Sequence, residues 1–192
     1  MQKDNIRHHI HLHFLVFIAG FTAILGKLIT NSPVSIVWHR MFIALIVIFF
    51  FVALTRKKLK TSYRNIFKYA ILGFIISLHW ITFFMSIDYS NVTIALSMMS
   101  TTAFFTSFIE PFFFSRKIIA HELLLSILVI VAIFLILNSE LKYSVGIILG
   151  IFSAFFASIF SVLNGLLIKN EKAYKISFYE FLFGVVFISI FL

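Results

Sequence analysis

Three charged residues lie deep inside long apolar segments of the chain, where a charge is costly. They are Arg40, Glu110 and Glu180. An arginine at the centre of a membrane-spanning helix costs roughly 2.5 to 3.5 kcal/mol on the insertion scale, so such a residue needs a partner or a function. A guanidinium group can bind a carboxylate through two parallel hydrogen bonds. Carboxyl groups inside a membrane commonly serve in proton relays.

Arg40 lies nearly two helical turns inside its apolar segment and follows Trp38 and His39. One hypothesis is that Arg40 binds an anion or a carboxylate in a central cavity, together with Trp38. The other is that Arg40 only ties its helix to backbone carbonyls of neighbouring helices. The sequence leaves both open.

Glu180 occupies the equivalent place in a later apolar segment, with Tyr179 beside it. The two segments enter from opposite faces, and each charge lies about six residues from its own face. At 1.5 Å per residue across a core of ~30 Å, Arg40 and Glu180 then differ in depth by roughly 12 Å. We therefore expect them to bracket a midplane cavity from its two ends. The alternative for Glu180 is a pair with Lys175.

Glu110 stands immediately before Pro111, whose ring removes a hydrogen bond from the helix. The predicted role of these two residues is structural. Glu110 would hold a gate closed through Arg116 or Lys117. A role of Glu110 in proton coupling is the alternative.

Four hydroxyl side chains fall on one face of a helix over 92–114, at offsets of 0, 4, 7 and 8 residues. They are Thr93, Ser97, Ser100 and Thr101. Such a stripe can line a wet cavity or hydrogen-bond to a neighbouring helix. Because His79 and Trp80 precede it in the adjacent segment, we expect a cavity lining.

The elements that position these residues must be membrane helices. Of the 192 residues, 61% are apolar and 12% are charged, against roughly half and a quarter in soluble domains. A spanning helix needs about 20 apolar residues. The expected spans are residues 13–30, 34–54, 66–86, 92–114, 119–137, 143–168 and 173–192. In the sixth span we expect small residues to pack against another helix; they are Gly146, Gly150, Ser153, Ala157 and Ser161.

The basic residues predict the orientation of the bundle. With the N-terminus inside, 13 of the 16 Lys and Arg residues lie on the cytoplasmic side and two on the other. This is the asymmetry that the positive-inside rule requires. The net charge of +9 is thus explained by topology, and we predict no nucleic-acid partner.

An internal repeat relates the two ends of the chain. Residues 21–29 and 37–42 match residues 160–167 and 177–182. The repeat unit is therefore five helices, and an odd number inverts the second copy, as in secondary transporters. We expect an all-α polytopic bundle with a cytoplasmic tail (1–12), a first repeat (13–137) and a second repeat (143–192) of which only two helices are present, seven spans of an expected ten.

The chain resembles the EamA-type transporters of the drug/metabolite transporter superfamily, ten-helix bacterial inner-membrane proteins made of two five-helix repeats. The resemblance lies in Pro33 with residues 38–40, in residues 79–87 followed by 92–95, in 110–114 and in 146–154. It implies a multi-pass inner-membrane secondary transporter or exporter of small amino-acid-like or drug-like metabolites that works by alternating access. The predicted substrate-binding residues are Trp38, Arg40, His79, Trp80, Ser97, Thr101, Tyr179 and Glu180.

Several function classes lack the residues that they need. The chain has no cysteine, and it has no Walker loop, no zinc-hydrolase helix and no nucleophile elbow. We therefore expect no enzymatic activity, no cofactor and no metal site. The expected partners are a small-molecule substrate and the lipid bilayer, with a homodimer as a further option. The alternative function is a helical membrane scaffold or assembly subunit that transports nothing.

Overall fold

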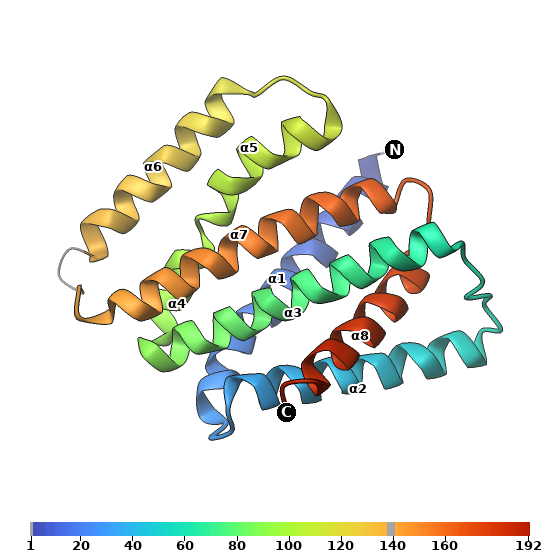
Figure 1. Ribbon diagram of the computed structural model, residues 1–192. Helices are drawn as coiled ribbons and strands as arrows, with labels where there is room; N and C mark the ends of the chain where they lie inside the picture. The colour runs from blue at the N-terminus through green and yellow to red at the C-terminus, as the bar shows by residue number, and fades with distance from the viewer. Residues whose placement is uncertain (1, 138–140) are drawn as a thin grey trace.

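The computed structural model describes residues 2–137 and 141–192, and within these ranges every element of secondary structure is a helix (Figure 1). This confirms the all-α polytopic fold. The elements are α1 (Gln2–Leu28), α2 (Pro33–Leu54), α3 (Tyr63–Tyr89), α4 (Val92–Met99), α5 (Thr102–Phe114), α6 (Ala120–Leu137), a 3-10 turn η1 (Leu141–Tyr143), α7 (Ser144–Leu167) and α8 (Ala173–Ser189).

Five of these segments are long and apolar enough to cross a membrane: α1, α2, α3, α4 together with α5, and α7. The other two expected spans correspond to the shorter helices α6 and α8. Helix α1 begins at Gln2, so the expected tail of residues 1–12 is helical from that point. The expected loop after residue 137 falls partly on residues 138–140, which lie outside the described ranges.

Residues with short polar side chains cap the N-termini of several helices, at the polar breaks between the apolar segments of the sequence. The Ser32 hydroxyl accepts a hydrogen bond from the Ser35 amide and Pro33 follows at the first helical position of α2. The Ser62 hydroxyl caps α3 in the same way, and the Asn91 side chain accepts from the Ile94 amide of α4 at 2.9 Å. Such caps satisfy amide groups that the first helical turn leaves unpaired.

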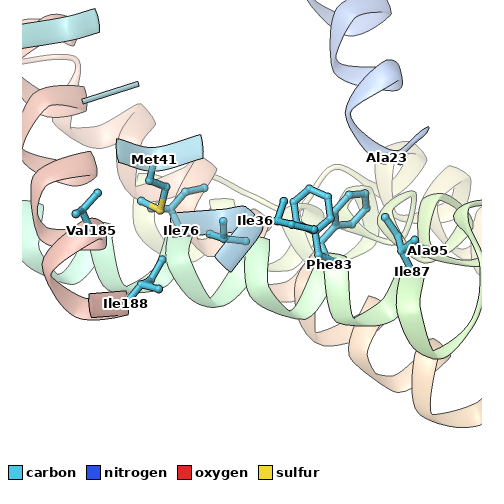
Figure 2. Close-up of a cluster of buried hydrophobic side chains, with 11 residues drawn as sticks. Ala23, Ile36, Met41, Ile76, Phe83, Ile87, Ala95, Val185 and Ile188 are labelled. Atoms are coloured by element: carbon cyan, nitrogen blue, oxygen red, sulfur yellow. The ribbon is translucent and has the colours of Figure 1, made fainter. Parts of the chain in front are cut away.

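Helix α3 is the centre of the bundle and packs against α7, α8, α2, α1 and α4. In Figure 1 it runs beside α7, with α8 and α2 on its other side. Core side chains of α3 meet those of α2 and α8; Figure 2 shows Met41, Ile76, Val185 and Ile188 gathered at one end of this cluster. Phe83 and Ile87 extend it toward Ala95 of α4.

Helix α7 reaches α3 and α4 through small residues. A Cβ atom at Gly146 would lie 2.6 Å from Cβ of Ser90, and one at Gly150 would lie 2.6 Å from Cβ of Met98. The buried face continues through Ser153, Ala154, Ser158 and Val162. The expected packing role is therefore confirmed at the first three small positions. Ala157 is only partly buried, and the expectation is wrong for the exposed Ser161, because the buried face turns onto Ala154 and Ser158.

Helices α2 and α8 lie antiparallel. At one end the Trp38 indole nitrogen donates to the Ser189 hydroxyl at 2.8 Å, and at the other the Tyr174 and Tyr179 hydroxyls donate to carbonyls of the loop after α2. Opposite directions are what inverted copies of one helix require. The five-helix repeat and the ten-helix total remain predictions.

Candidate functional site

The Arg40 guanidinium lies over aromatic rings of α3. Its central carbon is 4.8 Å from the centre of the Trp80 ring and 5.4 Å from that of Phe84. A cation over the face of such a ring is attracted by its quadrupole. Among the described residues, Arg40 has neither an ion pair nor a hydrogen bond to a backbone carbonyl. Its five N–H donors thus remain available to a ligand.

Two hollows meet at Arg40. A cavity of about 140 Å³ lies between α2, α3 and α8 and is lined by Val37, Arg40, Met41, Ala44, Trp80 and Phe181. A wider hollow of about 580 Å³ lies between α1 and α2 and is lined by Ile18, Phe21, Thr22, Leu25, Arg40, Ile43 and Ala44. Arg40 and Ala44 belong to both. Apolar walls with one strongly polar group are typical of small-molecule sites.

Trp38 lies two residues before Arg40, about half a helical turn away, and makes a different contact. Its ring stacks on Phe42, with centres 4.8 Å apart, and its nitrogen binds Ser189 of α8. This joins α2 to α8 near the end of the bundle that lies away from the basic loops. Trp38 is not among the residues that line either hollow at Arg40.

His79 faces α7, whereas Trp80 faces Arg40. The Nδ1 atom of His79 is 3.0 Å from the Ser153 carbonyl oxygen, and the Ser153 hydroxyl donates to the His79 carbonyl at 3.0 Å. His79 is only 7% exposed. The structure therefore separates the two neighbours that the sequence groups together, and it places His79 in the seam between α3 and α7.

The hydroxyl stripe of the fourth span lies at a break in the helix. The hydroxyl groups of Ser100, Thr101 and Thr102 each donate at 2.6 Å to the carbonyl three residues earlier. Hydroxyls bonded in this way compete with helical hydrogen bonds, and α4 ends at Met99 while α5 begins at Thr102. Ser97 supplies one of these carbonyls. Ser97 and Thr101 thus take part in the break, and neither lines a hollow at Arg40.

Glu180 and Tyr179 lie at the basic end of the bundle. Tyr179 stacks on Tyr69 of α3 and donates to the Leu59 carbonyl at 3.1 Å. Glu180 is 4% exposed, and its Oε1 atom has no hydrogen-bond partner among the described residues. Lys175, the alternative partner, pairs with Glu171 at 2.9 Å.

Arg40 and Glu180 contact different levels of α3. Arg40 lies over Trp80, whereas the Glu180 carbonyl oxygen would lie 2.6 Å from a Cβ atom on Gly73. Seven residues of helix correspond to about 10 Å of rise. No direct pair between them is present in the described part of the chain.

Glu110 belongs to a separate polar hollow of about 440 Å³ between α5 and α6. The Arg116 guanidinium bridges Glu110 at 3.2 Å and Glu122 at 3.1 Å. Hydrogen bonds to Glu110, and then to Glu122, raise the pKa of Arg116 above its ordinary value. Helix α5 continues past Pro111 to Phe114, and the next residue, Ser115, has a left-handed backbone with φ of 52°. The gate role of Glu110 and Pro111 remains a prediction.

Sequence reasoning missed several residues around Arg40: Phe84, Val37, Met41, Ala44 and Phe181. Helical spacing could have found three of them. Phe84 follows Trp80 by four residues, Ala44 follows Arg40 by four, and Val37 precedes Arg40 by three, so each shares a face with its neighbour. Met41 and Phe181 carry no such signal.

Comparison with known families gives one match. The model of the EamA-like transporter family matches residues 10–138, about two thirds of the chain. The matched range runs from α1 to the end of α6. No curated protein and no solved structure shows significant similarity to the chain.

Proposed function

The chain belongs to the EamA-like transporter family, a membrane transporter family of the drug/metabolite transporter superfamily, and from this premise we propose that it moves small amino-acid-like or drug-like metabolites by alternating access. Membership points to a transporter rather than an enzyme. We place the protein in a bacterial inner membrane with its N-terminus in the cytoplasm.

One observation carries the proposal. The Arg40 guanidinium is unpaired among the described residues and lines both hollows. Its helix α2 packs against α8, and these are the second helices of the two expected repeats. Substrate sites of repeat-built transporters lie near the midplane at the repeat interface. Arg40 would there bind a carboxylate or another anionic group of the solute.

Thiol labelling tests whether this site is open to water from both sides. Because the chain has no cysteine, an Ala44→Cys variant carries a single thiol, which lines both hollows at Arg40. We expect a membrane-impermeant thiosulfonate to label it from either side of the membrane. A Val47→Cys variant is the matched control, since Val47 is on the same helix, is 61% exposed and lines neither hollow; we expect no labelling there. An Ala44→Cys variant that reacts from neither side would support the scaffold alternative.

The proposed orientation has its own test. The loop after α2 carries more basic residues than any other loop of the described chain, so an enzyme reporter fused after Lys58 should be active in the cytoplasm. A reporter fused after Asp88, at the far end of α3, should be active in the periplasm. Two reporters on the same side, or the reverse pattern, would contradict both the orientation and the inverted repeat.

A further inference from the structure

A further hollow, remote from Arg40 and from Glu110, lies between α3 and α7 at the basic end of the bundle. It has a volume of about 220 Å³ and is lined by Lys68, Ile71, Leu72, Leu163, Leu166 and Leu167. Apart from Lys68 every lining residue is leucine or isoleucine. Such walls fit a hydrocarbon chain and offer nothing to a polar solute.

Lys68 in this groove, and Arg64 four residues before it on α3, are both without a countercharge among the described residues. Both residues are exposed. The nearest acidic residue in the adjoining loop is Glu171, which is occupied by Lys175 at 2.9 Å and by the Asn65 amide at 2.6 Å. The positive charge at the groove therefore faces outward.

The fold gathers further positive charge at the same end. The Tyr174 and Tyr179 hydroxyls bind the carbonyls of Lys58 and Leu59, which joins the loop after α2 to the start of α8. The basic residues of these two loops and of their helix ends are Arg56, Lys57, Lys58, Lys60, Arg64, Lys68, Lys169, Lys172 and Lys175. Clusters of this size next to a membrane span attract anionic lipids.

We propose that this groove binds one anionic phospholipid, with an acyl chain against the leucines of α7 and the phosphate between Lys68 and Arg64. The positive charges of Lys68 and Arg64 favour an anionic head group, and the apolar walls of the groove favour an acyl chain. Lysine suits this position because its methylene stem can follow the groove while the ammonium group stays at the head-group level. The lipid would fill the seam between α3 and α7, and the proposal does not depend on transport through the Arg40 site.

Native mass spectrometry of the purified chain in detergent tests the proposal, with dioleoyl phosphatidylglycerol and dioleoyl phosphatidylcholine as probes. We expect about fivefold tighter binding of the phosphatidylglycerol, since one basic contact near a membrane surface is worth roughly that factor. A Lys68→Gln variant should lose this preference and a Lys68→Arg variant should keep it. A Lys172→Gln variant is the matched control, because Lys172 is exposed at the same end but does not line the groove.

Three results would overturn the proposal. They are equal binding of the two lipids by the unmodified chain, an equal loss of preference in the Lys68→Gln and Lys172→Gln variants, and displacement of the lipid by free glycerol 3-phosphate. The second result would indicate diffuse attraction by the basic loops. The third would indicate a phosphate site without a role for the acyl chain.

Discussion

Replacing Arg40 by glutamine should lower the rate at which an anionic thiosulfonate labels the Ala44→Cys variant by about tenfold. Residues four apart on a helix are neighbours at about 6 Å. A unit charge at that distance contributes between roughly 0.7 kcal/mol in water and 2.8 kcal/mol near a protein surface, and 1.4 kcal/mol corresponds to a factor of ten. The rate for a cationic thiosulfonate of similar size should rise or stay the same.

Two variants control this measurement. Arg40→Lys keeps the charge and should keep the fast anionic reaction, whereas Lys27→Gln removes a charge that lines neither hollow and should change nothing. Equal anionic rates in the Arg40→Gln and unmodified backgrounds would show that the guanidinium does not set the potential of these hollows.

Transport assays of an Arg40 variant distinguish a binding role of Arg40 from a structural role. For radiolabelled amino acids in proteoliposomes, a binding role predicts that Arg40→Lys weakens apparent affinity while the inserted amount is unchanged, because lysine lacks the planar fork. A structural role predicts lower abundance and lower thermal stability, with unchanged affinity in the protein that survives. The contacts of Arg40 with the Trp80 and Phe84 rings are compatible with folding of both the Arg40→Lys and the Arg40→Gln variants.

Replacing Gly73 by alanine should destabilise the bundle by about 1 to 3 kcal/mol, the usual cost of overpacking a close contact. A Cβ atom there would lie 2.6 Å from the Glu180 carbonyl oxygen and 2.9 Å from the Gly184 nitrogen. Both are backbone atoms of α8, so only separation of α3 from α8 can relieve the clash. A lower melting temperature in detergent is the expected measurement.

Alanine substitutions at two other glycines serve as controls for the loss of stability expected in Gly73→Ala. At Gly184 the added Cβ atom would meet the flexible end of Met41, which can move, so Gly184→Ala should cost less. At Gly20 nothing lies within 4 Å, so Gly20→Ala should not lower the melting temperature and should raise it slightly, because alanine is favoured over glycine in a helix interior by about 1 kcal/mol. A Gly73→Ala variant as stable as Gly20→Ala would contradict the close approach of α3 and α8.

Adjacent residues show that sequence neighbours need not contact the same helices. His79 and Trp80 are neighbours in sequence, and the sequence predicts that both bind substrate. Consecutive side chains on a helix, however, do not face the same way. In the structure Trp80 contacts Arg40 and His79 contacts Ser153 of α7. The hydroxyls of Ser100 and Thr101, which the sequence predicts to line a cavity, donate to carbonyls of their own helix at its break.

The sequence by itself determined the membrane class and the helical fold. Its motifs also resemble those of the family whose model matches residues 10–138. These properties follow from the length and composition of each segment, which are local. Only the tertiary structure decided which face of each helix is buried, which charges are paired, and that Arg40 joins two hollows. The physical reason is that lipid and protein interior are equally apolar, so a lipid-facing leucine and a core leucine look alike in the sequence of a membrane helix.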